Sequence, residues 1–156
     1  IHKGKLLAMV PKCYLPSYNE FYEARFWTSG LGVNLDIQDF GHSFKLAPEQ
    51  ILNFNNKVII GIETCEDLWS LNPPSVNMAM NGANIILNLS ASNELVGKSG
   101  YRKDLVIQQS ARLNAGYLYA SANALESTKD VVFSGACLAA ENGTLLAEGE
   151  RFSFND

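Results

Sequence analysis

A cysteine, a lysine and a polar loop each follow an apolar run in this sequence. Cys65 comes after the run at residues 58–62. Lys12 follows a shorter run that Pro11 ends, and residues 90–93 follow a third. Because parallel strands place their carboxyl ends at one edge of a sheet, we expect these residues to share that edge. A thiol and an ammonium placed together suit nucleophilic attack with stabilisation of the resulting oxyanion.

Cys65 is either a nucleophile or an ordinary buried cysteine, which is what most cysteines are. A neighbouring cation such as Lys12 would activate the thiol. The N–H of Glu66, next to the nucleophile, would be a second donor to the oxyanion. His2 and His42 lie near the start of the chain and in a glycine-rich connector, so we expect a carboxylate base in place of histidine. These residues predict acyl transfer from an amide through a thioester.

The composition and net charge of the chain argue against a disordered, a nucleic-acid-binding and a membrane-spanning protein. Hydrophobic residues make up 47% of the chain and charged residues 18%, which predicts a globular fold. The net charge of −4 and the absence of an apolar run near ~20 residues favour neither a nucleic-acid nor a membrane partner. The cysteines and histidines show no metal-site spacing, and we expect no metal or cofactor in this chain. Cys13 and Cys137 are interpreted as small packing residues, and the odd cysteine count favours a cytoplasmic protein.

Apolar periodicity predicts strands and helices in alternation. Two helices are expected, at residues 74–81 and 101–115, each ended by a glycine, Gly82 and Gly116. A strand–helix–strand–helix–strand order followed by a hairpin predicts an α/β sheet. Strands are expected at residues 5–10, 44–46, 58–62, 83–89, 117–123, 131–133, 136–140 and 145–148.

Three further segments are less regular. Residues 51–54 are ambiguous, and one interpretation pairs them with the following strand through a turn at residues 55–56. Residues 28–41 are expected to form a glycine-rich connector. Residues 12–27 are rich in aromatics, with one short helical turn expected at 19–26. They form either a ligand-pocket loop or a packed surface loop, and the position of the lysine favours the pocket.

Three motifs resemble the nitrilase, or carbon–nitrogen hydrolase, superfamily. They are Pro-Lys-Cys-Tyr-Leu-Pro around Lys12, Glu-Thr-Cys-Glu-Asp-Leu-Trp around Cys65, and Asn-Leu-Ser-Ala-Ser-Asn at residues 88–93. The resemblance implies an α/β fold of the nitrilase type, an α-β-β-α sandwich, of which residues 1–156 would be the C-terminal portion of one glutaminase domain. Further stretches resemble the glutaminase domains of the glutamine-dependent NAD synthetase family, at residues 11–16, 18–23, 97–98, 101–102, 126–130, 141–143 and 148–152.

The resemblance also implies roles for single residues. Cys65 matches the nucleophile that attacks the side-chain amide of glutamine. Lys12 matches the lysine that stabilises the oxyanion, and Glu23 matches an additional glutamate that supports this lysine and the substrate. Three positions match glutamine-binding residues of the synthetase branch, namely Tyr18, Glu66 and Ser92.

Partners and cofactors follow from the same resemblance. In that family the ammonia released from L-glutamine is used by a second domain, which amidates deamido-NAD to NAD with ATP. We expect L-glutamine as the substrate here, and ATP, Mg and deamido-NAD at a synthetase domain. The Ser-Gly-Gly phosphate loop expected of such a domain does not occur in these 156 residues. The superfamily's sandwich usually pairs with a second copy, so a homo-oligomer is expected.

The sequence departs from the family at the general base. The family's base glutamate lies upstream of the lysine, and none of the eleven residues before Lys12 is acidic. We therefore expect these 156 residues, as a piece of a longer protein, to have no meaningful glutaminase activity alone. Two alternatives stay open. One is a stand-alone amidase or nitrilase-like hydrolase, which residues 101–102 and 126–130 disfavour. The other is a catalytically silent piece with a structural or interaction role.

Overall fold

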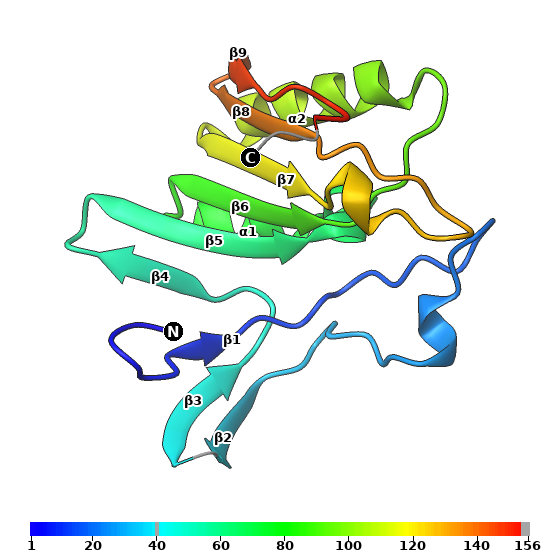
Figure 1. Cartoon of the computed structure of the whole chain (residues 1–156). Helices are drawn as coiled ribbons and strands as arrows, with labels where there is room; N and C mark the ends of the chain where they lie inside the picture. The colour runs from blue at the N-terminus through cyan, green and yellow to red at the C-terminus, as the bar shows by residue number, and fades with distance from the viewer. Residues whose placement is uncertain (40, 154–156) are drawn as a thin grey trace.

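The structure, a computed structural model, describes residues 1–39 and 41–153. Figure 1 shows two helices packed behind a large sheet, with a small sheet below it. No helix in these ranges is both long and apolar enough to cross a membrane. The elements in chain order are β1 (Ala8–Met9), the 3-10 helix η1 (Glu23–Arg25), β2 (Leu35–Asp39), β3 (His42–Leu46), β4 (Ile51–Phe54), β5 (Val58–Thr64), the 3-10 helix η2 (Cys65–Trp69), α1 (Pro74–Met80), β6 (Ile85–Ser90), α2 (Lys98–Leu113), β7 (Gly116–Ser121), the 3-10 helix η3 (Ala124–Glu126), β8 (Cys137–Glu141) and β9 (Thr144–Glu148).

The large sheet has parallel strands at its centre. Its strand order is β4-β5-β6-β7-β8-β9, and β5, β6 and β7 run parallel to one another. The helices α1 and α2 connect these three strands, as the predicted strand–helix–strand–helix–strand order requires. The carboxyl ends of β5 and β6 therefore lie at one edge of the sheet, where η2 and the loop after Ser90 begin.

The helix-covered face of the sheet holds the core. Ile86 of β6 and Tyr117 of β7 are paired in register, and both are completely buried. Gly61 of β5 is paired with Ile86. A Cβ on Gly61 would lie 2.6 Å from the sulfur of Met78 in α1, so only glycine lets this helix pack so closely.

The opposite face of the sheet is also apolar. The next register row consists of Ile62, Leu87, Leu118 and Ala139, on four neighbouring strands. Leu118 is 44% exposed and Leu89, further along β6, is 57% exposed. No helix among the described residues covers this face in Figure 1. The described chain thus supplies one helix layer and one main sheet of a sandwich.

The predicted hairpin around residues 141–143 is confirmed, the hairpin considered for residues 51–62 also forms, and both turn through left-handed residues. The β4–β5 turn contains Asn55 and Asn56, with φ of 56° and 58°. The β8–β9 turn contains Asn142 and Gly143, with φ of 48° and 80°. Two successive left-handed residues suit the twist of antiparallel strands, and asparagine and glycine adopt them with little strain. The ambiguous residues 51–54 are therefore a strand.

Strands in the first third of the chain differ from the expectation. The strand expected at residues 5–10 shortens to Ala8–Met9, because β1 pairs only with β3 and Pro11 lacks an N–H to continue the ladder. The predicted connector at residues 28–41 contains a strand, β2, which pairs antiparallel with β3. Its glycines, which suggested turns, lie outside the strand.

The later part of the chain also needs corrections. Residues 131–133 are not a strand, because their backbone groups bond to loop residues, as Val132 O does to the N–H of Glu94. The helix expected at residues 101–115 is α2 at Lys98–Leu113. Asn114, with φ of 51°, ends it, whereas Gly116 is the first residue of β7. Asparagine is the usual alternative to glycine in this left-handed position.

Candidate active site

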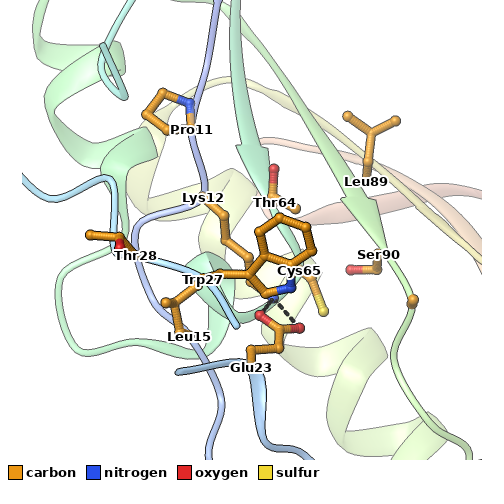
Figure 2. Close-up of a pocket in the computed structure, with 11 residues that line it drawn as sticks. Pro11, Lys12, Leu15, Glu23, Trp27, Thr28, Thr64, Cys65, Leu89 and Ser90 are labelled. Atoms are coloured by element: carbon orange, nitrogen blue, oxygen red, sulfur yellow. Dashed lines mark hydrogen bonds and ion pairs between the residues drawn. The ribbon is translucent and has the colours of Figure 1, made fainter. Parts of the chain in front are cut away.

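Cys65 stands at the corner between β5 and η2, after the strand end and before a helix. Its φ is 49°, in the left-handed region that few residues other than glycine adopt. Such strain persists only where the surroundings impose it, and it is concentrated at functional sites. Figure 2 shows the Cys65 sulfur directed into a pocket at the carboxyl edge of the sheet.

This pocket has a volume of about 500 Å³ and draws its wall from separate parts of the chain. Three of its residues are reactive or charged, namely Lys12, Glu23 and Cys65. The structure therefore brings the three predicted catalytic residues together. The other lining residues are apolar or small: Pro11, Leu15, Trp27, Thr28, Thr64, Leu89, Ser90 and Ala91.

Lys12 and Glu23 form a two-pronged ion pair in this pocket. The Lys12 Nζ lies 2.6 Å from Glu23 Oε2 and 2.8 Å from Oε1. Their side chains are 17% and 31% exposed, so the pair is partly shielded from water. An ammonium has three N–H donors, and a pair fixed in this way leaves one for a negatively charged oxygen. The single turn of η1 positions Glu23 for this contact.

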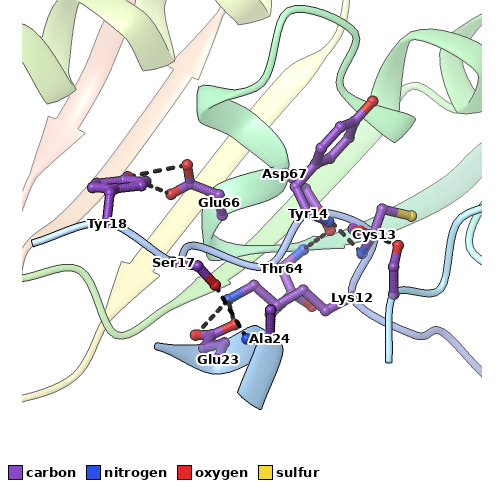
Figure 3. Close-up of polar contacts among 11 residues, drawn as sticks. Lys12, Cys13, Tyr14, Ser17, Tyr18, Glu23, Ala24, Thr64, Glu66 and Asp67 are labelled. Atoms are coloured by element: carbon purple, nitrogen blue, oxygen red, sulfur yellow. Dashed lines mark hydrogen bonds and ion pairs between the residues drawn. The ribbon is translucent and has the colours of Figure 1, made fainter. Parts of the chain in front are cut away.

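The predicted substrate-binding residues lie beside the pocket and are absent from its wall. The Tyr18 hydroxyl donates to both carboxylate oxygens of Glu66, at 3.0 Å each. Figure 3 shows this pair separate from the Lys12–Glu23 pair. Ser92 is buried, and its N–H donates to Ser121 Oγ at 3.2 Å. The predicted substrate-binding residues therefore lie next to the predicted catalytic residues, which line the pocket.

A second cation lies close to this region and was given no role from the sequence. Lys98 Nζ donates to Asn93 Oδ1 and sits 5.1 Å from the centre of the Trp69 ring. Asn93 in turn donates to the Glu20 carboxylate. Burial lowers the pKa of Lys98, while negative charges that include Glu20 oppose this shift. Lys98 precedes the helix expected at residues 101–115 and served only as part of the family resemblance, so sequence reasoning gave it no role.

Asp67 is a further residue that sequence reasoning missed. It is 1% exposed, and its carboxylate accepts hydrogen bonds from the N–H groups of Cys13, Tyr14 and Thr64. Figure 3 shows it between the Lys12 segment and the strand end. The spacing Thr64-x-x-Asp67 is that of a helix capping box, and this signal could have drawn attention to it.

The other two cysteines differ from Cys65. Cys13 is 2% exposed, and burial together with the Asp67 carboxylate raises the pKa of its thiol to about 12. It therefore stays protonated at neutral pH and cannot act as a nucleophile. The prediction that Cys13 is a packing residue agrees with this burial. The same prediction is wrong for Cys137, because its side chain is exposed on β8.

The described residues contain no cluster of three or more His, Cys, Asp or Glu side chains that could hold a metal ion. The charged groups near Cys65 are instead engaged with one another, with polar side chains or with backbone N–H groups. The arrangement can therefore present a thiol, a fixed ammonium and hydrogen-bond donors to a carbonyl compound.

Comparison with known proteins extends this description. No family model matches the chain. The glutamine-dependent NAD(+) synthetase of Mycobacterium tuberculosis is 40% identical over 158 residues, which include 97% of this chain. The chain is related to glutamine-dependent NAD(+) synthetases. A crystal structure of such a synthetase, from Cytophaga hutchinsonii, matches 92% of the chain with a TM-score of 0.78 and 28% identity. The chain spans 23% of the length of each of these synthetases.

A more distant likeness concerns the fold alone. An amidase of the nitrilase superfamily from Nesterenkonia matches 90% of this chain and 44% of its own, with a TM-score of 0.64 and 14% identity. The nitrilase-type fold expected from the motifs is therefore confirmed. The synthetases resemble the chain in sequence as well as in fold, whereas the amidase, at 14% identity, resembles it in fold alone.

Proposed function

We propose that this chain carries the nucleophile and the oxyanion-stabilising lysine of a glutamine-hydrolysing site in a glutamine-dependent NAD synthetase. The ammonia released would serve the ATP-dependent amidation of deamido-NAD at a synthetase domain with Mg. One observation carries the proposal: Cys65, on a left-handed corner, faces the same pocket as the Lys12–Glu23 pair. The 40% identity to the Mycobacterium tuberculosis synthetase supports the choice of glutamine over other amides.

The proposed reaction has two stages. The Cys65 sulfur attacks the side-chain amide carbon of glutamine, and the carbonyl oxygen becomes an oxyanion held by Lys12 Nζ and the N–H of Glu66. The C–N bond then breaks, the nitrogen takes a proton and leaves as ammonia, and a thioester remains. Water hydrolyses this thioester to glutamate and regenerates the thiol.

The charges beside the pocket suit an amino acid as substrate. Lys98 offers a cation for an α-carboxylate, and the carboxylates of Glu20 and Glu66 offer acceptors for an α-ammonium. Tyr18 orients the Glu66 carboxylate through its two hydrogen bonds. We assign Tyr18, Glu66 and Ser92 to glutamine binding on this basis and on the family resemblance. Opposite charges at fixed separation would favour glutamine over simple aliphatic amides.

A general base is still needed to take the thiol proton. Four carboxylates lie in or beside the pocket, and each has another partner among the described residues, which for Glu20 is Asn93. Glu23 pairs with Lys12, Glu66 accepts from Tyr18, and Asp67 accepts from three backbone N–H groups. The proposal therefore requires a further carboxylate, and we expect the 156 residues alone to release no ammonia from glutamine at the rate of the intact protein.

The deciding experiment replaces Cys65 in the intact protein. Cys65→Ala should abolish NAD synthesis with glutamine and leave synthesis with added ammonia unchanged, because only the nitrogen source is lost. Cys137→Ala is the matched control, since it removes an exposed thiol from β8, and should behave as wild type. Retention of glutamine-dependent synthesis by Cys65→Ala would overturn the proposal. Equal turnover of glutamine and aliphatic amides would point to an amidase instead.

A labelling experiment identifies the nucleophile directly. A thiol-directed glutamine analogue should modify Cys65 in preference to the other two cysteines. The raised pKa of Cys13 keeps that thiol protonated, and Cys137 lies outside the pocket in which the glutamine part would bind. Free glutamine should protect Cys65 from the label. Mass spectrometry of the digested protein locates the modified residue, and labelling of Cys13 or Cys137 in its place would contradict the assignment.

A further inference from the structure

The Asp67 carboxylate connects two parts of the site that are far apart in the sequence. Its Oδ1 accepts the N–H groups of Cys13 at 3.0 Å and Tyr14 at 2.9 Å. Its Oδ2 accepts the N–H of Thr64 at 2.9 Å. Cys13 and Tyr14 directly follow Lys12, whereas Thr64 directly precedes Cys65. One buried side chain therefore binds the backbone on both sides of the proposed reaction centre.

The Lys12 segment is also held from its other side. Ser29 Oγ donates to the carbonyl of Cys13 at 2.5 Å. The Gly30 N–H donates to the carbonyl of Lys12 at 2.8 Å. Because the segment is fixed between Asp67 and residues 29–30, it has little freedom to move relative to Cys65. We refer to these contacts of residues 12–14 with Asp67, Ser29 and Gly30 as the clamp.

A carboxylate is the side chain that these contacts require. Ionised aspartate only accepts hydrogen bonds, and both of its oxygens do so here. Asparagine has the same shape, but its NH₂ group would face an N–H donor and lose at least one contact. Burial raises the pKa of Asp67, and the three N–H bonds oppose that shift by favouring the charged form.

Helix capping explains only part of this arrangement. The bond from Thr64 N–H to Asp67 closes the first turn of η2 and would be present in any capping box. The other two bonds go to a segment 53 and 54 residues earlier in the chain, which contributes nothing to the helix. These two bonds do, however, fix the backbone directly after Lys12, which carries the ammonium.

We propose that Asp67 is a positioning residue that holds the Lys12 ammonium at its working distance from the Cys65 thiol. The inference rests on the proposed glutamine hydrolysis and adds to it a residue that touches neither the substrate nor the reacting atoms. Lys12 stabilises charge that develops in the transition state, so its displacement should reduce turnover more than substrate binding. A shift of about 1 Å in such a group costs on the order of 100-fold in rate.

The test is Asp67→Asn in the intact protein, with ammonia release from glutamine as the measurement. We expect kcat to fall by about 100-fold while KM stays within about threefold of wild type. Glu63→Gln is the matched control, because Glu63 is also 1% exposed and accepts one backbone N–H, that of Ser75 in α1. Glu63 contacts no part of the clamp, so this variant should lose stability and keep the wild-type kcat.

A double-variant cycle separates positioning from general destabilisation. If Asp67 acts through Lys12, then Asp67→Asn should cause less than about threefold further loss once Lys12→Ala is present. Losses that multiply in the double variant would overturn the inference. An Asp67→Asn protein with the wild-type kcat would overturn it as well.

Ser29→Ala keeps the inference testable if Asp67→Asn does not fold. It removes the bond from Ser29 Oγ to Cys13 O and the bond that Ser29 Oγ accepts from the N–H of Leu31, and it leaves Asp67 in place. We expect about a fivefold loss of kcat at unchanged KM. If Asp67→Asn does not fold and Ser29→Ala keeps the wild-type kcat, the inference is overturned. The proposed function fails separately: a wild-type protein that releases no ammonia from glutamine overturns that function. A wild-type protein that does release it, with an equally active Asp67→Asn variant, overturns the role of Asp67 alone.

Discussion

At the scale of the residue, the site depends on charges that are fixed by partners. The Lys12 ammonium could take many positions on its flexible side chain, and the Glu23 carboxylate restricts it to one at the pocket. Both side chains are partly exposed, so the pair should contribute little to stability. In the proposed reaction, the effect of the pair is to place the ammonium where the oxyanion would form.

Glu23→Gln tests this function of the ion pair. The amide keeps the shape of the side chain but loses its charge, so Lys12 should be held less firmly. We expect kcat/KM for glutamine to fall by roughly 10- to 100-fold, with a change of less than about 1 kcal/mol in the free energy of unfolding. Asp36→Asn is the control, since it breaks an exposed ion pair with Lys45 on the small sheet. Equal activity of both variants would contradict the argument.

At the scale of the element, the site depends on close approach of backbone segments. Gly30 lies against Pro11 and the Lys12 carbonyl, where a side chain would not fit. Glu63 connects β5 to α1 and β7, because it accepts from the N–H of Ser75 and from the hydroxyl of Tyr117. The Gly30 contact fixes the Lys12 segment of the site, whereas the Glu63 contacts join the main sheet to its helix layer and lie outside the pocket wall.

Gly30→Ala should disturb the Lys12 segment. The added Cβ would lie 2.7 Å from Pro11 Cβ and 2.9 Å from Lys12 O, so one of the two segments must move. We expect a loss of about 1–3 kcal/mol in the free energy of unfolding, together with reduced glutamine hydrolysis. Gly100→Ala in α2 is the control, because no atom lies within 4 Å of its added Cβ. It should stabilise the protein by up to about 1 kcal/mol.

Glu63 should make the stability depend on pH. Burial raises its pKa above the ordinary value of 4.5, so the folded protein binds this proton more tightly than the unfolded chain does. The stability that protonation contributes is therefore present at low pH and is lost as the pH rises through the folded pKa. Denaturant unfolding should show a larger stability advantage of wild type over Glu63→Gln at pH 5 than at pH 7. An equal stability advantage at the two pH values would contradict the prediction.

At the scale of the whole molecule, the main sheet has one covered and one open apolar face. The helices cover the row that contains Ile86 and Tyr117, whereas the row that contains Leu87 and Leu118 faces away from them. Apolar surface of this kind is unfavourable in water and promotes association. The isolated 156 residues should therefore self-associate more strongly than a domain in which both faces of the sheet are covered.

Self-association of the isolated 156 residues tests this conclusion. We expect the apparent mass in sedimentation to rise with protein concentration. Leu118→Ser should weaken association, because Leu118 lies within the open row and is 44% exposed. Leu71→Ser is the control, since Leu71 is fully exposed in the connection between η2 and α1 and belongs to no sheet face. A concentration-independent monomer would refute the prediction.

The central part of the fold was predictable because its signals are local. Residues 58–62 and 83–89 form continuous apolar runs, and the paired asparagines at residues 55–56 mark a turn, so strand and hairpin followed from neighbouring residues. The strand at Leu35–Asp39 was missed, because only its partner β3 makes it a strand. Residues 131–133 were assigned wrongly for the opposite reason, since their β-branched residues found no neighbouring strand.

The sequence by itself determined that a cysteine follows an apolar strand, and the family resemblance of its motifs implied that Lys12 and Glu23 belong to one site. Strand ends, apolar runs and motif spacing are properties of short stretches, so they can be read without a fold. Only the tertiary structure decided that Asp67 holds the Lys12 segment, because its bonds span 53 and 54 residues. It also decided that Cys13 is buried with a raised pKa, since burial and neighbouring charge depend on the packing of distant segments.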